Sequence, residues 1–386
     1  MRSLLLVLVG VFGVCGVWAA AVSDPQPARP ADGRIMYVGT YTRAPSKGIY
    51  AYRLNAAGEL TPMGTAGLVA ETENPSFLAV HPNQRFLYAV NELDRDAGRV
   101  SAFSIDRTTG TLTLLNAVPS RGGSPCHVSI DRTGKWLFVA NYGGGSVAAF
   151  PVEADGRLRE ASAFFQHAGS SANKARQSGP HGHAVVVSPD NRFVLAADLG
   201  LDKVLTYRLD AAAGGLAPAD PPFATIAPGS GPRHLAFRPD GRFVYVLNEM
   251  LSNVVAFSYD AARGALTELQ TVSTLPEGFS GDSSGAEIIA HPNSRFLYAS
   301  NRGHDSIAGF RIDNATGKLT ALDRVPTQGK TPRGFEIDPS GRFLIAANQN
   351  SGTVVVFRID QNSGGLTPTG TTVQVPFPVS LAFVNP

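Results

Sequence analysis

Residues 81–91 read His-Pro-Asn-Gln-Arg-Phe-Leu-Tyr-Ala-Val-Asn, in which a proline turn leads into an apolar run that ends at an asparagine. The pattern recurs five more times, with Arg132 in place of the proline in one copy. The further copies end at Asn141, Asp198, Asn248, Asn301 and Asn348. The proline position and the final Asn or Asp are nine residues apart in every copy, whereas the copies lie 47 to 57 residues apart. A fixed core with variable spacing predicts a rigid β-hairpin joined by loops of variable length.

Each copy extends into a unit of four short strands. The apolar run before the proline, as at 76–80, and the run after it, as at 86–90, form the hairpin, whose two turn residues are often Asp-Gly, Ser-Gly or Thr-Gly. A third run, as at 99–105, precedes the turn pattern Asp-x-x-x-Gly-x-Leu, in which the glycine supplies a positive φ. A short fourth strand, as at 111–118, completes the unit.

The two ends of the chain set the number of units. Residues 35–41 and 48–54 match the second and third strands of a unit whose first strand is missing. The missing strand is found at 379–386, which match residues 75–82. We therefore predict an all-β fold, a seven-bladed β-propeller of four-stranded blades, closed by the C-terminal strand joining the first blade. Two β-sandwich domains, the alternative, would not predict this C-terminal fragment.

The N-terminus is typical of an export signal. Residues 1–21 combine Arg2, an apolar run over 4–18 and three alanines at 19–21, which indicates a cleaved signal peptide; an uncleaved N-terminal anchor is the alternative. A linker at 22–32 and a propeller domain at 33–386 follow. We expect a periplasmic or extracellular monomer with no other membrane contact. After cleavage only Cys126 remains, so no internal disulfide can form. The net charge is +2 without a basic stripe, which argues against a nucleic-acid partner.

Hairpin pairing places residues of different blades at one mouth of the central channel. The residue six before the proline should face the residue nine after it, at the end away from the turn. The first position holds Ser76, Cys126, His183, Arg233, Ala286, Arg333 and Ser380. The second holds Thr40, Asn91, Asn141, Asp198, Asn248, Asn301 and Asn348, and the residue after it is Tyr41, Glu92, Tyr142, Leu199, Glu249, Arg302 or Gln349. The chemistry of the mouth differs from blade to blade, which indicates a polar small-molecule site.

Several residues near this mouth have both a structural and a functional interpretation. Arg233 and Glu249 flank one hairpin, so they form either a salt bridge that closes a blade or a pair that binds an anion and handles protons. His181 and His183, two apart, can share one side of a strand. The set continues with His127, His234, Glu287, Arg302 and Arg333. The repeated asparagines are interpreted as structural, because they recur, and Cys126 as an inert buried thiol.

The motifs of the later blades together resemble one known family. They are Ser178–His183, Asp198–Gly200, Gly231–His234 with Asn248-Glu249, Ala286–Ile288, Tyr298–Gly303 and Thr331–Phe335. They look like the lactonase family of seven-bladed propellers, which includes bacterial 6-phosphogluconolactonase and fungal carboxy-muconate lactonizing enzyme. The resemblance extends over the chain after residue 33. It implies hydrolysis or formation of a lactone with no required metal or cofactor.

The resemblance also suggests roles for single residues. It makes His183, Arg233 and Glu249 the expected catalytic residues, with His181 as the second choice of histidine. From the resemblance and from their place at the mouth, we also expect His181, His234, Glu287, Arg302 and Arg333 to bind substrate, a small lactone that is anionic or derived from a sugar. Glu249 or His183 would activate water, and the arginines would hold the anionic group and the oxyanion.

Two other functions remain open at the level of sequence. 6-Phosphogluconolactone is a cytoplasmic metabolite, so an export signal points either to another sugar lactone or to a non-catalytic envelope propeller that binds a small molecule or a protein at the mouth. A metal-dependent lactonase is the third hypothesis, because Glu92, Asp198, Glu249 and the repeated asparagines offer oxygen ligands that suit Ca²⁺ or a similar ion. The nearby arginines, however, would repel a cation.

Overall fold

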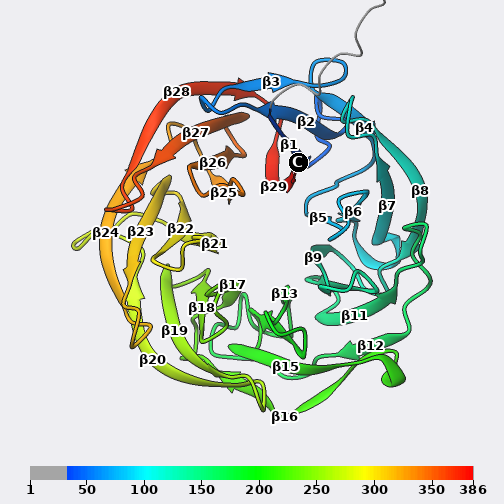
Figure 1. Cartoon of the computed structure of the whole chain (residues 1–386). Coiled ribbons are helices and arrows are strands. Elements are labelled where there is room, and N and C mark those ends of the chain that lie inside the picture. Colours follow the sequence, from blue (N-terminus) through cyan, green and yellow to red (C-terminus); the bar gives the residue numbers. More distant parts are fainter. Residues whose placement is uncertain (1–32, 386) are drawn as a thin grey trace, which may run out of the picture. The chain divides into compact units, whose positions relative to one another are not determined.

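The computed structural model describes residues 33–385, and these form a ring of seven β-sheets around a central channel (Figure 1). The first blade contains β29 (Pro378–Val384), β1 (Arg34–Thr40), β2 (Gly48–Leu54) and β3 (Leu60–Pro62), with β4 (Leu68–Glu71) also paired to β2. The second contains β5 (Leu78–Val80), β6 (Phe86–Asn91), β7 (Arg99–Ile105) and β8 (Leu112–Pro119). The third contains β9 (Pro125–Ile130), β10 (Trp136–Asn141), β11 (Ser146–Pro151) and β12 (Ala163–Gln166). The predicted propeller is thus confirmed.

The remaining four blades follow the same order from the channel outwards. The fourth contains β13 (Gly182–Val187), β14 (Phe193–Asp198), β15 (Lys203–Asp210) and β16 (Gly215–Thr225). The fifth contains β17 (Pro232–Phe237), β18 (Phe243–Asn248), β19 (Asn253–Asp260) and β20 (Ala265–Ser273). The sixth contains β21 (Ser284–Ala290), β22 (Phe296–Arg302), β23 (Ser306–Ile312) and β24 (Leu319–Pro326). The seventh contains β25 (Pro332–Ile337), β26 (Phe343–Asn348), β27 (Thr353–Ile359) and β28 (Leu366–Gln374). Two short 3₁₀ turns, η1 (Arg95–Ala97) and η2 (Ala211–Ala213), lie in loops.

The C-terminal strand closes the ring as the sequence predicts. β29 pairs antiparallel with β1, with Tyr37 opposite Ala382 and Gly39 opposite Ser380. The first blade therefore takes its innermost strand from the end of the chain. The proposed signal peptide (1–21) and linker (22–32) lie outside the described residues. Within residues 33–385, no helix has the length and apolar character needed to span a membrane.

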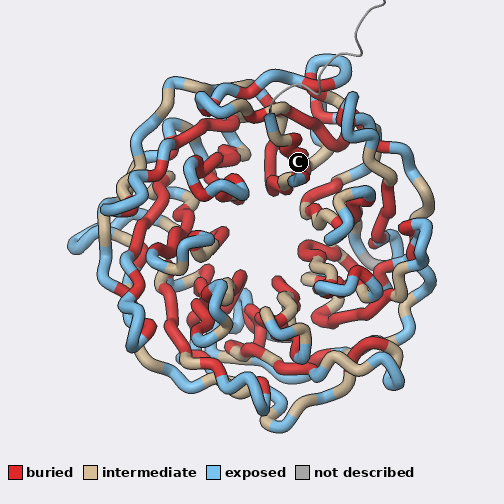
Figure 2. Tube along the Cα trace, viewed as in Figure 1, coloured by how far each residue is buried: buried red, intermediate tan, exposed pale blue. Residues whose placement is uncertain are grey.

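The core consists of apolar layers between neighbouring blades. Each of seven buried clusters joins residues of two adjacent blades, as in the layer that packs Tyr88 and Val90 against Leu137 and Phe150. Figure 2 shows the inner and middle strands largely buried and the outermost ones largely exposed. Because most of the buried apolar surface lies between blades, each blade depends on its two neighbours for stability.

The repeated turn glycine has a packing reason as well as a conformational one. Gly317 adopts φ +71°, and a Cβ there would come within 2.2 Å of the Phe243 ring of the preceding blade. Its carbonyl also accepts a hydrogen bond at 3.0 Å from the buried hydroxyl of Tyr245. Tyr37, Tyr88 and Tyr298 make equivalent bonds to the corresponding turn of the next blade. In these four blades the motif therefore links one blade to the next.

The repeated asparagines at the other end of the hairpins are structural, as expected. Asn348 donates to the carbonyl of Thr327, which follows the outermost strand of the preceding blade, at 3.1 Å. Asn141 and Asn301 make the same bond to Ser120 and Thr274. These side chains satisfy backbone groups where the chain passes from one blade to the next.

The predicted hairpin register is correct along most of each inner strand and wrong at the mouth. In the fifth blade, Phe237 to His234 pair with Val244 to Leu247 as predicted, but Asn248 then pairs with Pro232. Arg233 is the additional residue of a β-bulge, so it does not face Asn248. The inner strands β9, β13, β21 and β25 bulge at the equivalent position. A bulge changes the direction of its side chains, and here it lets two successive residues reach the channel mouth.

Candidate active site

A small cavity at the mouth receives a side chain from every blade. Its free volume is about 10 Å³, and it is lined by Phe77, Glu92, Cys126, His183, Arg233, His234, Glu287, Arg333 and Val379. Arg233 and His234 are the two bulge residues of one strand, and both reach the cavity. The arrangement brings together residues that are far apart in the sequence, as ring closure requires.

Three arginines, one of which lines this cavity, surround the carboxylate of Glu249. Arg233 Nε lies 3.2 Å and Arg302 Nη2 3.1 Å from Oε2, while Arg176 Nη2 lies 2.8 Å from Oε1. Burial opposes the charge of Glu249, but Arg302, Arg233 and Arg176 outweigh it and lower its pKa to about 2. Glu249 is therefore charged at neutral pH, where it is a weak base and pairs with three guanidinium groups.

A fourth arginine is held from the opposite side of the mouth. Arg333 Nη2 donates to the Tyr41 hydroxyl at 2.8 Å, and this hydroxyl lies 3.0 Å from both carboxylate oxygens of Glu92. Ser76 donates to the same carboxylate at 2.5 Å. Glu92 and Tyr41 thus hold the Arg333 guanidinium group in place, and Glu249 does the same for the other three arginines. Glu92 and Glu249 therefore anchor different arginines at the mouth.

His234 and Glu287 form a buried pair below the arginines. His234 Nδ1 lies 2.7 Å from Glu287 Oε1, which also accepts the backbone N–H of Ile288 at 3.0 Å. Burial, aided by Arg233, lowers the pKa of His234 well below its usual value, and burial raises the pKa of Glu287 to about 7. A neutral His234 that donates Nδ1–H to Glu287 keeps the lone pair of Nε2 free. This is the protonation state that a general base requires.

The other histidines occupy different places around this pair. The His183 ring lies 5.2 Å from that of His234, and its Nδ1 lies 3.8 Å from Cys126 Sγ. Burial lowers the pKa of His183 well below its usual value. His181 does not line the cavity; its ring stacks on Tyr142 at 4.5 Å, and its Nδ1 lies 2.9 Å from the Tyr142 carbonyl. His183 therefore reaches the cavity, whereas His181 lies at its rim.

Several buried polar atoms of this site have no hydrogen-bond partner among residues 33–385. They include the Nε atoms of Arg302 and Arg333 and Nε2 of His234. Arg233 and His234 are each only 3% exposed. Leaving buried donors and acceptors unpaired costs free energy, so these groups around the channel mouth indicate a place for a polar ligand.

The family follows from comparison with known sequences. A family model described as Lactonase, 7-bladed beta-propeller, matches residues 35–383. The chain belongs to this family. The lactonase-family chain is 39% identical to a 6-phosphogluconolactonase of Bacillus subtilis over 91% of its own length and 98% of that protein. It is 37% identical to a 6-phosphogluconolactonase of Formosa agariphila over 78% and 86% of the two chains.

A solved structure supports the same family. The periplasmic gluconolactonase of Pseudomonas aeruginosa superimposes with a TM-score of 0.85 and 38% identity, covering 91% of the lactonase-family chain and 99% of that protein. The resemblance inferred from the motifs is thus confirmed at the level of the family and of the fold.

The oxygen ligands proposed for Ca²⁺ do not meet at one centre in this lactonase-family chain. Glu249 is occupied by three guanidinium groups, and Asp198 accepts three backbone N–H groups and contacts His167. No group of three or more His, Cys, Asp or Glu residues suited to a metal is found in the described part of the chain. The residues present do not fit the metal-dependent hypothesis.

Sequence reasoning missed Arg176 as a member of the site. It lies on the loop between β12 and β13, where its side chain is 44% exposed and reaches both Glu249 and the Tyr142 hydroxyl. The loop has no counterpart in the repeat pattern, so counting residues from the proline of each hairpin could not place Arg176 at the mouth. With Arg176, four guanidinium groups face the carboxylates of Glu92 and Glu249, and the mouth carries an excess of positive charge that attracts anions.

Proposed function

We propose that the chain hydrolyses a sugar lactone to the aldonic acid at this mouth, and that His234 is the general base. The cavity combines a free basic nitrogen, His234 Nε2, with the guanidinium group of Arg233. This juxtaposition carries the proposal, because ester hydrolysis needs a base for the water and a donor for the developing oxyanion. The family and the activity of its named relatives support it.

The proposed reaction uses residues already in position. His234 Nε2 accepts a proton as the oxygen of water attacks the lactone carbonyl carbon, and Glu287 stabilises the resulting imidazolium through Nδ1–H. Arg233, which is anchored by donating to the Ala286 carbonyl, stabilises the oxyanion. When the ring C–O bond breaks, the imidazolium returns the proton to the leaving alkoxide. His183 is the second candidate base, since it reaches the same cavity.

Glu249 has a binding role in this proposal rather than a proton-transfer role. A carboxylate whose pKa is about 2 accepts protons poorly at neutral pH. It orients Arg233, Arg302 and Arg176, whose remaining donors then face the hydroxyl groups or the anionic tail of the substrate. The excess of positive charge at the rim accommodates a phosphorylated substrate, and the hydroxyl groups of an unphosphorylated one can use the same donors.

The decisive experiment measures turnover of δ-gluconolactone and its 6-phospho form above the spontaneous rate. We expect His234→Ala to lower kcat by about 10²-fold or more with a small effect on KM, whereas His183→Ala lowers it less. An Arg233→Ala/Glu249→Gln double variant should lose most of its activity. Wild-type protein that binds these lactones without hydrolysing them would instead identify a non-catalytic propeller. Equal rates for wild type and His234→Ala would remove His234 as the base.

We also propose that the protein acts after export. The sequence pattern of residues 1–21 and the relation to a periplasmic gluconolactonase support this location. Fractionation of cells that express the full chain should find the mature protein outside the cytoplasm, shortened near residue 21. Full-length protein in the cytoplasm would contradict the proposal.

A further inference from the structure

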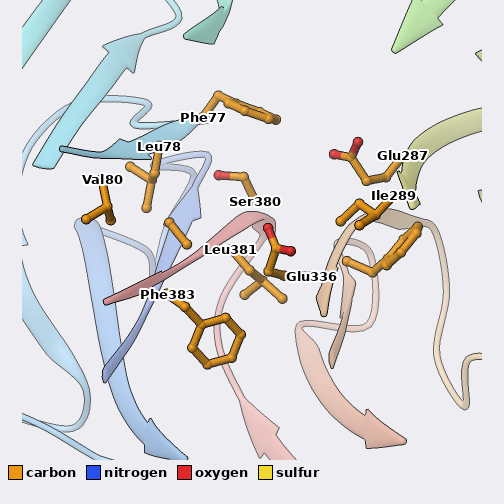
Figure 3. A pocket seen from close by; sticks show the side chains of 11 residues that line it. Phe77, Leu78, Val80, Glu287, Ile289, Glu336, Ser380, Leu381 and Phe383 are labelled. Carbon is orange, nitrogen blue, oxygen red and sulfur yellow. The ribbon is translucent and has the colours of Figure 1, made fainter. Parts of the chain in front are cut away.

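A larger hollow lies in the channel below the candidate active site (Figure 3). It has a free volume of about 330 Å³ and is bounded by the inner strands of the first, second, sixth and seventh blades. Phe77 and Glu287 line both this hollow and the cavity of the site. Glu287, the partner of His234, therefore forms part of the wall between the two spaces, and Figure 3 shows its carboxyl group at the edge of the hollow.

The channel wall in this part is apolar with one titratable exception. In every blade, the residue three before the proline position is half-buried, whereas the residue four before it is buried. Six of these half-buried residues are Ala79, Ser129, Val186, Ala236, Ile289 and Phe383, and the seventh is Glu336. Partial exposure at the same level of all seven strands means that water can reach this level of the channel.

The Glu336 side chain has few interactions that would stabilise a carboxyl group at this position. Within the described chain it accepts one hydrogen bond, from the backbone N–H of Ile337 at 2.9 Å, and forms no salt bridge. Burial raises the pKa of Glu336 to about 8, with a contribution from the charge of Glu287. The side chains that face it from β5, β21 and β29 are apolar except for Glu287 and the hydroxyl of Ser380. A purely structural wall would carry alanine or valine here, as other blades do.

We propose that Glu336 transfers protons between Glu287 and the water of the lower channel, so that the proton released by lactone hydrolysis leaves through the face opposite the substrate mouth. This inference rests on the proposed function. The overall reaction converts lactone and water into a hydroxy-carboxylate and one proton. The substrate covers the upper mouth, and the carboxylic acid formed there loses its proton to the His234–Glu287 pair. Glu336 then accepts this proton through intervening water and releases it to the channel.

The pKa values of the two carboxyl groups suit such a transfer. Glu287 is raised to about 7 and Glu336 to about 8, so neither group holds the proton much more tightly than the other. Both carboxylates accept the N–H of the following residue, which orients them similarly at the channel wall. Figure 3 shows both groups reaching the same hollow from neighbouring strands, β21 and β25.

Chemical rescue of Glu336 variants tests the relay. We expect Glu336→Ala and Glu336→Gln to lower kcat about tenfold in a weakly buffered solution while KM stays within about twofold. Small carboxylic acids or imidazole that enter the lower channel should restore the kcat of Glu336→Ala, because they replace the missing carrier. A purely structural role of Glu336 would not make kcat depend on the buffer. Glu160→Ala, which alters an exposed glutamate on the third blade, is the control and should behave as wild type.

The outcomes separate this inference from the proposed function. Wild-type turnover together with unchanged, buffer-independent kcat in both Glu336 variants would overturn the relay and leave the lactonase proposal intact. Absence of wild-type turnover would overturn both. If Glu336→Ala folds poorly, the near-isosteric Glu336→Gln still decides the question, because full activity in that variant contradicts the relay.

Discussion

Arg176 is the arginine of the mouth whose side chain is most accessible to solvent, and its contribution can be separated from folding. It pairs with Glu249 at 2.8 Å but is 44% exposed, so its removal should cost little stability. We expect Arg176→Ala to raise KM for an anionic lactone about five- to tenfold with kcat nearly unchanged, because it removes one donor at the rim. Lys174→Ala, an exposed change on the same loop, is the control. Steady-state kinetics with equal KM for the two variants would exclude this role.

The carboxyl groups of Glu249 and Glu336 should affect stability in opposite pH ranges. Glu249 has a folded-state pKa of about 2, below its ordinary 4.5, so its stabilising contribution is present above pH 4.5 and is lost as the pH falls towards 2. Glu336 has a folded-state pKa of about 8, so the folded protein favours the protonated form and loses stability as the pH rises from 4.5 to 8.

A prediction for Glu336→Gln follows from this difference. The variant cannot ionise, so it should unfold at a higher temperature than wild type at about pH 9 and at nearly the same temperature at about pH 5. We expect the difference in unfolding free energy at the higher pH to be on the order of 1 kcal/mol, since channel water reduces the cost of the charge. Thermal unfolding monitored at both pH values measures it. A variant less stable than wild type at about pH 9 would contradict the assignment.

At the scale of the element, the repeated β-bulge explains how much of the site could be read from the sequence. Counting from the proline identified Arg233, His183 and Arg333 at the mouth, because the hairpin register is fixed by the turn. The same count treated His234 and Glu287 as mere neighbours. In a regular strand the next residue would point to the opposite face. No residue pattern in the sequence predicted the bulge that brings His234 and Glu287 into the site.

The loop between β12 and β13 is the element that brings Arg176 and His181 to the rim, and Asp198 holds it. Asp198 replaces the asparagine of other blades; it accepts the N–H of His181 and contacts His167 Nδ1 at 2.6 Å. His167 in turn contacts the Tyr207 hydroxyl at 2.9 Å. All of these groups are buried or half-buried, so the anchor of this loop is continuous with the core of the blade.

Asp198→Ala should therefore affect both stability and substrate binding. Removing one partner of a buried charged network costs about 3 kcal/mol, and a loosened loop would raise KM in the same direction as Arg176→Ala. Denaturant unfolding and steady-state kinetics measure the two effects. Asp190→Ala, at an exposed turn of the same blade, is the matched control. If the Asp198→Ala protein is less stable but has the KM of wild type, Asp198 is not needed to hold the loop in its substrate-binding position.

At the scale of the whole molecule, the fold could be predicted because the same four-stranded blade is repeated seven times. Proline turns, turn glycines and apolar runs recur with the hairpin, and the C-terminal match to residues 75–82 revealed the closure. The chemistry could be predicted only in outline, since pKa values depend on how Arg233 or Arg302 approaches Glu249 in space. Spacing left open whether Glu249 is a base or a counter-ion, and the three guanidinium groups around it favour the counter-ion.

Closure of the ring can be tested by removing β29. Truncation before Pro378 exposes the full edge of β1 and removes Leu381 and Val384 from the apolar layers on both sides of the first blade. We expect the truncated protein to unfold more than about 10 °C below wild type and to aggregate through the exposed edge, as shown by thermal unfolding and size-exclusion chromatography. Asn385→Ala, at an exposed position after β29, should leave the unfolding temperature unchanged. A synthetic peptide of residues 376–386 should restore part of the lost stability, because it can pair with β1 in place of the missing strand. A truncated monomer with wild-type stability would show that the ring does not depend on this strand, and the convergence of seven inner strands on one mouth would then need another cause.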